Sequence, residues 1–497
     1  MENSAWTKKE YDSAPEVVDR LDQGPFGIEQ DDSWATILTT TPSEQPIRNY
    51  GMGLIGYTWE ESGPSLAARE NRETLEQHVE KLASLPFIDL LYIRCDWRDV
   101  QQRAGRLDFS PIWKLTLEAA KIYNLRVAFR IQLSNTVIQP QHLSMPDFLQ
   151  EKIPLVDIGS MPDQFPEKGR FREPRYDHPE FRKAFRELNG LLAAEFDNDP
   201  LIEFMDLMMY GFWGEGHTAN LPHPFPGDRT AERTFVDLTR LQLETWEKVP
   251  LVVNTQPDIS RVGNRHVQSM AVRAGCWLRS DSIITEEPIQ IDMLANRPPW
   301  LAVIMEEGLR RSHSLNADAL DMDNAGLDYR TRAALHALDI GSNYWAVWTE
   351  GENLENYYQR FPASFDLLKR RLGYRVRPSW IWQRKRSGAC ELIVAMANDG
   401  VAGVPGILRV SIESSDRKFK VTGGLDAGQP YAGKVWQASF ILPAGMMGQK
   451  VRLQAELETK GGIRRPVQWA CAQPLEQDGS IPIQLLPEKD NRWRKGI

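Results

Sequence analysis

Two glutamates with unusual neighbours stand out in this sequence. Glu215 lies in the small-residue run Gly-Phe-Trp-Gly-Glu-Gly at 211–216, and Glu306 ends an apolar run and is followed by Glu307. Two carboxyl groups that face each other across a cleft can protonate a leaving oxygen from one side and attack, or activate water, from the other, as cleavage of a glycosidic bond requires. Singly, each is more often a solvated or ion-paired residue, so the elements that position them decide between these readings.

The positioning elements are short apolar runs separated by longer amphipathic stretches between residues 50 and 350. The runs cover 50–57, 88–94, 125–131, 202–210, 250–254, 275–280, 300–306 and 344–349. Helical spacing appears between them, for example at Leu75, Val79 and Leu82, and Ser110-Pro111 is a good helix start. Eight strands that alternate with helices predict a (β/α)8 TIM barrel, an α/β fold. No glycine-rich nucleotide-binding signature follows any of these runs.

The pattern changes after residue 375. The segments 390–397, 408–413, 435–442 and 451–457 are short, partly alternating, and separated by Gly, Pro, Asn and Asp. This predicts a C-terminal antiparallel β-sandwich. We therefore expect a segment of residues 1–45 that wraps the barrel, a barrel over 46–375 and a β-sandwich over 376–497.

Active sites of such barrels lie where the strands end, so polar and aromatic residues at those ends are the candidates. Alternation along the seventh run turns residues 302, 304 and 306 toward the barrel axis, which favours Glu306 over Glu307 as the catalytic residue. The parity at Glu215 stays open, because Gly211 and Gly214 permit a bulge. The expected substrate-binding residues are Trp59, Arg94, Asp96, Trp97, Arg130, Trp213, His217, Asn254, Arg279, Asp281, Glu307, Trp348 and Glu350.

Several stretches resemble a known group of enzymes. They are 92–131, which begins YIRCDWRDVQQ, 177–218, which ends MMYGFWGEGHT, 298–307, which reads PPWLAVIMEE, and 370–376, which reads RRLGYRV. Over about residues 50–480 the chain is similar to barrel-plus-sandwich glycosidases of the retaining clan that includes β-galactosidases and cellulases. The resemblance implies Glu215 as acid/base, Glu306 as nucleophile, Arg94 at the end of strand 2 and Trp348 at the end of strand 8. It also makes a β-galactoside the first substrate to consider.

The chain departs from that clan at two places. Gly214 stands where the clan has Asn, and Arg279-Ser280-Asp281 replaces a Tyr near strand 6. Asn254 and Asp281 are the candidates to take over the missing contacts. The departures motivate a second hypothesis, a barrel that binds carbohydrate without turnover.

Two further questions concern metals and arginines. Glu215, His217 and His223 are candidate metal ligands for a metal-assisted hydrolase, but no HExxH or cysteine partner accompanies them, so we expect neither metal nor cofactor. The arginines near the strand ends could meet an anionic sugar, or form internal ion pairs with aspartates such as Asp281; the ion pairs are the favoured reading.

Composition excludes several classes. The 497 residues include 59 Lys+Arg and 68 Asp+Glu, a net charge of −9 without a basic patch for nucleic acid. No run approaches about 18 apolar residues, so no membrane span is expected. The four cysteines lie far apart and are interpreted as ordinary thiols. The start is polar and has no signal-peptide pattern, which predicts a cytoplasmic protein unless a leader has been removed.

Tryptophan is abundant, with 16 residues, and divides into two expected populations. Trp59, Trp97, Trp213 and Trp348 fall at strand ends, where indole rings stack on sugars. Trp113 and Trp246 fall in helical stretches, where core packing is the default. The expected partner is an oligo- or polysaccharide; the sequence does not indicate the oligomeric state.

Overall fold

The structure is a computed structural model. It describes residues 24–25, 33–59, 72–217, 221–255, 264–281, 283, 286–306, 329–347, 354–355, 358–359, 361–386, 388–425 and 436–490. The chain divides into two compact units. One runs from Tyr50 to Gly373 and includes Thr459–Ile463, and the other combines the segment before Tyr50 with the rest of the chain after Gly373.

The first unit is a closed barrel of parallel strands, in the order β10-β11-β2-β3-β4-β7-β8-β9. The strands are β2 (Gly53–Trp59), β3 (Leu90–Asp96), β4 (Arg126–Gln132), β7 (Ile202–Asp206), β8 (Leu251–Asn254), β9 (Trp277–Ser280), β10 (Val303–Glu306) and β11 (Tyr344–Val347). Each overlaps one of the eight apolar runs, so the predicted TIM barrel is confirmed. The eight-stranded parallel barrel also fits the resemblance to barrel glycosidases.

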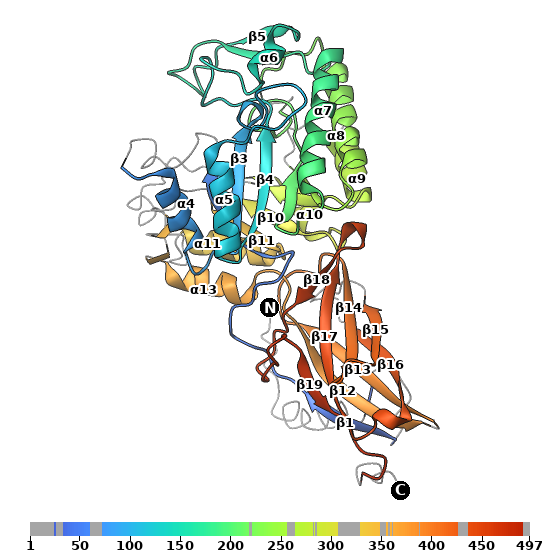
Figure 1. Ribbon diagram of the computed structural model, residues 1–497. Helices are drawn as coiled ribbons and strands as arrows, with labels where there is room; N and C mark the ends of the chain where they lie inside the picture. Colours follow the sequence, from blue (N-terminus) through green and yellow to red (C-terminus); the bar gives the residue numbers. More distant parts are fainter. Residues whose placement is uncertain are drawn as a thin grey trace, which may run out of the picture. The chain divides into compact units, whose positions relative to one another are not determined.

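Amphipathic helices alternate with the strands. They are α4 (Leu75–Ala83), α5 (Pro111–Ile122), α7 (Pro179–Phe196), α8 (Asp228–Thr245), α9 (Asn264–Arg273), α10 (Pro288–Ala295), α11 (Tyr329–Asp339) and α13 (Pro362–Arg371). A capping box in which Thr74 and Gln77 satisfy each other's backbone N–H groups starts α4. Pro111 opens α5 directly after Ser110, as predicted. In Figure 1, α5 lies beside β3 and β4, and α7 lies beside α8.

A long insertion between β4 and α7 was not recognised from the sequence. It contains α6 (Asp147–Gln150) and the antiparallel pair β5 (Leu155–Gly159) and β6 (Phe171–Pro174). Figure 1 shows it beyond the end to which β3 and β4 point. Phe171 and Met161 of the insertion pack with Phe212 and Leu221, which follow β7. The insertion therefore supports the segment that carries Glu215.

The second unit is a pair of antiparallel sheets. One has the order β1-β12-β13-β16, and the other has the order β15-β14-β17-β18 with β19 paired to β17. Their bounds are β1 (Trp34–Thr39), β12 (Val376–Arg386), β13 (Ala389–Asn398), β14 (Ile407–Ser414), β15 (Lys420–Leu425), β16 (Trp436–Pro443), β17 (Lys450–Glu458), β18 (Arg464–Val467) and β19 (Ile481–Gln484). The predicted β-sandwich is confirmed.

One strand of this unit lies in a segment for which the sequence predicted no strand. Residues 34–39 form β1, which pairs with β12 from Trp34 opposite Arg384 to Thr39 opposite Trp380. These residues therefore complete a sheet of the sandwich unit, whereas residues 1–45 were expected to wrap the barrel.

Short 3-10 turns lie at η1 (Trp97–Asp99), η3 (Ala444–Met446) and η4 (Lys460–Gly462).

Two further observations concern the described residues. No helix among them combines the length and the apolar character needed to cross a bilayer. All four cysteines are buried and free, as interpreted from their spacing.

Candidate active site

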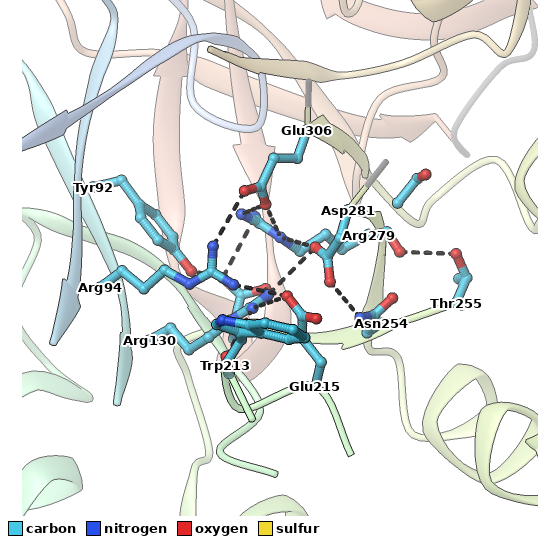
Figure 2. A network of polar contacts seen from close by, with 12 residues as sticks. Tyr92, Arg94, Arg130, Trp213, Glu215, Asn254, Thr255, Arg279, Asp281 and Glu306 are labelled. Atoms are coloured by element: carbon cyan, nitrogen blue, oxygen red, sulfur yellow. Dashed lines mark hydrogen bonds and ion pairs between the residues drawn. The ribbon is translucent and has the colours of Figure 1, made fainter. Parts of the chain in front are cut away.

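A buried network of charged side chains lies at the carboxyl ends of the barrel strands (Figure 2). We call it the charge cluster. It consists of Arg94 on β3, Arg130 on β4, Asp206 on β7, Glu215 after β7, Arg279 on β9, Asp281 after β9 and Glu306 at the end of β10. None of the seven residues is more than 8% exposed. Buried charges of this kind persist only when they are paired, so the contacts within the cluster fix its geometry.

A single guanidinium group joins the two predicted catalytic glutamates. Arg94 donates from Nη2 to Glu215 Oε1 at 2.7 Å and from Nη1 to Glu306 Oε1 at 3.3 Å. Figure 2 shows the two carboxyl groups approaching Arg94 from different sides. Only one guanidinium and two hydrogen bonds therefore separate the carboxylates of β10 and of the loop after β7.

Each glutamate also contacts a second arginine. Arg130 donates from Nη1 to Glu215 Oε1 at 3.2 Å. Arg279 donates to Glu306 Oε2 from Nη2 at 2.5 Å and from Nε at 3.1 Å. Because both glutamates are held from two sides, their carboxyl groups are fixed before any ligand arrives.

Two aspartates anchor these arginines in turn. Asp206 lies 3.5 Å from Arg130 Nη2 and 3.6 Å from Arg279 Nη1. Asp281 lies 3.5 Å from Arg130 Nη2 and accepts from Arg279 Nε at 2.8 Å. The arginines of the strand ends therefore form internal ion pairs, the reading favoured from the sequence.

Polar residues around the cluster complete the network. The Asn254 amide donates to Asp281 Oδ2, and the Tyr92 hydroxyl donates to Asp206 Oδ2 at 2.5 Å. Tyr57 accepts from Arg279 Nη2 at 2.9 Å. The candidate substitutes for the clan's missing contacts, Asn254 and Asp281, are thus bonded to each other at the site.

Sequence reasoning missed Asp206, Tyr57 and Tyr92. A usable signal was present, because alternate residues of a strand share a face. Tyr92 lies two residues before Arg94, and Asp206 ends β7 at the same edge of the barrel. Extending the alternation argument from β10 to every strand would have selected them.

The pKa values of two carboxyl groups in the cluster are shifted in opposite directions. Burial raises the pKa of Glu306, and Arg279 and Arg94 oppose that shift. Burial also acts on Asp281, but Arg130, Arg279 and Arg94 outweigh it and hold the pKa of Asp281 well below its ordinary value. Asp281 therefore stays ionised, whereas Glu306 is protonated more readily than a solvated glutamate.

The loop at 211–217 positions Glu215 through unusual backbone angles. Gly211, Trp213, Gly214 and Gly216 have φ values of 79, 61, 73 and 78°, all in the left-handed region. Trp213 N donates to Ser134 O at 3.0 Å, and Gly216 N donates to Tyr210 O at 2.9 Å. The three glycines of this run adopt such angles without strain, whereas Trp213 is held in a conformation that L side chains rarely adopt.

Gly214 gives a direct test of this loop. A Cβ at position 214 would lie 3.4 Å from Arg130 Cδ, and the φ of 73° disfavours any L side chain. We expect Gly214→Ala to reduce catalytic efficiency by about 10²-fold, because a small displacement of Glu215 misaligns the reacting groups.

The matched control for that variant is Gly105→Ala. Gly105 has a similar φ of 77° but open space around its notional Cβ. Both variants should lose about 1 kcal/mol of stability, which differential scanning calorimetry can compare. Only Gly214→Ala should lose activity, and equal activity of the two variants would contradict the assigned role of the loop.

Not every predicted site residue reaches the cluster. Trp97 is fully buried, donates from its indole N–H to Gln101 at 2.8 Å and packs edge-on against Phe181. Asp96 accepts from Ser144 at 2.8 Å and from Asn135 at 3.1 Å. These contacts lie outside the charge cluster, and we leave both residues out of the proposed site.

Other predicted residues lie at the margin of the cluster or outside the described part of the chain. Trp59 ends β2 and is half-buried. Trp213 contributes its backbone carbonyl to Arg130 at 3.2 Å, and its ring meets that of His217 at 5.3 Å. Glu307, Trp348 and Glu350 lie outside the described residues. Trp113 and Trp246 are fully buried, as expected for core tryptophans.

The insertion contributes a second buried carboxyl group close to the loop. Glu173 accepts from Ser134, from Tyr176 and, at 3.0 Å, from Gln139 Nε2. Burial raises the pKa of Glu173 to about 7, although these three donors oppose the shift. Tyr176 also accepts from Gly211 N at 3.4 Å, so Glu173 is linked to the start of the loop that carries Glu215.

This raised pKa predicts a pH-dependent stability. Between pH 4.5 and about 7 the unfolded chain releases the Glu173 proton while the folded chain keeps it, so stability falls as pH rises, by about 3 kcal/mol in total. Glu173→Gln removes this ionisation. The melting temperature of the variant relative to wild type should therefore be higher at pH 8 than at pH 5.

The exposed Glu167, also in the insertion, provides the control as Glu167→Gln. Its melting temperature should follow that of the wild type at both pH values. If the difference between Glu173→Gln and wild type were the same at pH 5 and pH 8, Glu173 would not titrate in this range.

The candidate metal ligands do not assemble into one group. His223 Nε2 lies 3.5 Å from Asp228, and His217 Nε2 lies 2.9 Å from Glu215 Oε2. Among the described residues, no three His, Cys, Asp or Glu side chains are arranged to hold a metal ion.

Comparisons with known proteins find similarity at the level of structure. No family model and no curated protein matches the chain. An endo-β-1,4-xylanase of glycoside hydrolase family 10 from Gloeophyllum trabeum matches with 7% identity, covering 60% of this chain and 84% of its own, at a TM-score of 0.39. A family 39 glycoside hydrolase from Bacteroides cellulosilyticus WH2 matches with 9% identity, covering 82% and 83%, also at 0.39. The exo-β-1,4-mannosidase Op5Man5 from Opitutaceae bacterium strain TAV5 matches with 14% identity, covering 68% and 58%, at 0.35.

Proposed function

We propose that this protein is a glycoside hydrolase that uses Glu215 and Glu306 as its catalytic pair. The observation that carries the proposal is the Arg94 bridge, which holds two buried carboxylates from β10 and from the loop after β7 at one barrel mouth. Carboxyl pairs of glycosidases work at roughly 5–5.5 Å when they retain configuration and at roughly 6.5–9.5 Å when they invert it. The guanidinium bridge supports a pair within this overall range.

The roles follow from the surroundings of each group. Glu306 lies between Arg279 and Arg94, which stabilise its carboxylate as a nucleophile toward the anomeric carbon. Glu215 would protonate the glycosidic oxygen and then deprotonate the water that releases the sugar. This is the retaining mechanism, and the partner is an oligo- or polysaccharide.

The charge balance of the cluster also bears on the substrate. Arg94, Arg130 and Arg279 face four carboxylates, Asp206, Glu215, Asp281 and Glu306, so the cluster has no excess of positive charge. This favours a neutral sugar in the position next to the glutamates. β-Galactosides are therefore a suitable first probe, ahead of uronates and sulfated sugars.

A screen of wild-type protein against aryl glycosides of neutral and acidic sugars tests the proposal. We expect hydrolysis of at least one neutral aryl β-glycoside that persists in EDTA, since the mechanism uses two carboxyl groups. Loss of all activity on chelation would instead favour metal-assisted hydrolysis.

The second candidate function is carbohydrate binding without turnover. It is favoured by the two arginines that donate to Glu215 Oε1, because they occupy one of the two oxygens from which an acid would donate its proton. Glycan binding by calorimetry with no product from any member of the panel would support this alternative.

A further inference from the structure

The two oxygens of Glu215 have different surroundings. Oε1 accepts from Arg94 at 2.7 Å and from Arg130 at 3.2 Å. Oε2 lies 2.9 Å from His217 Nε2. A proton on Oε1 would face two guanidinium donors, so a catalytic proton belongs on Oε2, the oxygen next to the imidazole.

The fold fixes the imidazole at this place. His217 is 6% exposed, and the Trp213 ring meets it edge-on at 5.3 Å and 84°. A Cβ on Gly211 would lie 3.3 Å from His217 N, so the two ends of the loop are in close contact. The loop thus closes on itself, which holds His217 against Glu215.

From this geometry we propose that His217 is a positioning residue that stores the catalytic proton for Glu215; the proposal rests on the glycosidase function above. Two arginines donate to Oε1, so Oε2 is the oxygen left to carry the proton that Glu215 must donate as an acid. The side chain next to Oε2 is a histidine, a residue type that exchanges protons near neutral pH and can supply that proton. The imidazolium of His217 holds one proton at Nε2, next to the carboxylate oxygen of Glu215 that passes the proton on.

The proton then moves through a closed cycle. In the first half-reaction it passes from His217 Nε2 to Glu215 Oε2 and on to the glycosidic oxygen, while the bond from that oxygen to the anomeric carbon breaks and Glu306 bonds to the carbon. In the second half-reaction Glu215 takes a proton from water, and the water oxygen displaces Glu306. The proton returns to Nε2, so the site ends as it began.

Several charged or titratable groups face this pair. Arg94 and Arg130 contact Glu215 from β3 and β4, and Asp281 interacts with it from the end of β9. Glu173 and His223 line the same small cavity as His217. The pH dependence expected below therefore reflects Glu215 and His217 in the presence of these charged and titratable neighbours. It is compared between variants that keep all of these neighbours.

The test compares His217→Gln with wild type on the phenyl and 2,4-dinitrophenyl glycosides of the sugar that the wild type hydrolyses. The phenolate leaving group needs a proton, so kcat/KM on the phenyl glycoside should fall about 10²-fold. The dinitrophenolate does not need one, so that kcat/KM should change by less than about threefold. The alkaline limb of the pH profile should move to lower pH, because the imidazole that supplies the proton to Oε2 is gone.

The matched control is His336→Gln. His336 Nε2 lies 3.2 Å from Glu286, a similar histidine–glutamate pair outside the cluster, and its loss should leave both substrates unaffected. Equal losses of His217→Gln on both glycosides, or an unmoved alkaline limb, would overturn the proposal while leaving the glycosidase function intact.

A measurement without turnover separates the two claims. The imidazole of His217 can be titrated by NMR in wild-type protein and in Glu215→Gln, and its midpoint should move to lower pH when the carboxylate charge is removed. Absence of hydrolysis by the wild type would refute the glycosidase function. An unchanged His217 midpoint would refute the proton storage on its own.

Discussion

Glu306→Gln should reduce kcat/KM by on the order of 10³-fold or more, because an amide cannot act as the nucleophile toward the anomeric carbon. The same substitution should leave the fold intact. It removes one negative charge from a cluster in which four carboxylates face three arginines, so Arg94 and Arg279 keep anionic partners in Glu215, Asp206 and Asp281. Steady-state kinetics and the melting temperature, measured on the same preparation, check both expectations.

Glu286→Gln is the matched control for this variant. Glu286 is a largely buried carboxylate just beyond β9 that accepts from Ser280 at 2.9 Å and contacts His336 instead of the arginines. We expect it to keep at least about half of the wild-type activity. Substantial turnover by Glu306→Gln would remove Glu306 from the catalytic pair.

Arg279→Met should be the most destabilising of the substitutions considered. Arg279 is fully buried and contacts Glu306, Asp281 and Asp206. Its loss leaves three carboxylates without one of their cations in a site away from solvent, which costs about 3–5 kcal/mol. Denaturant unfolding at pH 7 would show this as a lower midpoint.

Two further variants test whether lost ion pairs cause the destabilisation of Arg279→Met. Arg371→Met, at an exposed position at the end of α13, should change the midpoint little. The loss in Arg279→Met should shrink when the pH is lowered or when Asp281→Asn is added, because both changes neutralise a carboxylate that has lost its partner. A full loss that persists in the double variant would point to packing as its cause.

The barrel could be predicted from the sequence because its strands are buried on both faces. Such strands appear as continuous apolar runs, and each of the eight runs overlaps a strand of the closed barrel. The alternation argument on β10 selected Glu306, which the structure places within the charge cluster. Both arguments depend only on local chain geometry, which the sequence carries.

The first strand of the sandwich and the insertion were not predicted, for physical reasons. β1 pairs with β12, more than 300 positions away, and nothing local to residues 34–39 indicates that partner. β5 and β6 form a short, partly exposed pair whose residues lack a strong apolar pattern. Long-range pairing and weak patterning both fall outside what a periodicity argument can detect.

The site was predicted in its residue types but not in its contacts. Arg94, Arg130 and Arg279 were recognised at strand ends, yet the bridge from Arg94 to both glutamates depends on side-chain positions in β3, in β10 and in the loop after β7. Asp206 was missed because it precedes the more noticeable run around Glu215. Trp97 was expected at the barrel mouth, but it begins the 3-10 turn η1 and packs against Phe181 of α7 instead.

In the proposed mechanism Glu306 attacks the anomeric carbon, and Glu215 donates a proton to the leaving oxygen and later accepts one from water. The most direct test incubates the wild-type protein with a 2-deoxy-2-fluoro glycosyl fluoride of the sugar that it hydrolyses and follows the protein by intact mass and peptide mapping. A retaining enzyme with this pair should gain the mass of one fluorosugar on the peptide that contains Glu306. Continued turnover of substrate with no adduct, or an adduct on a different carboxylate, would contradict the assignment.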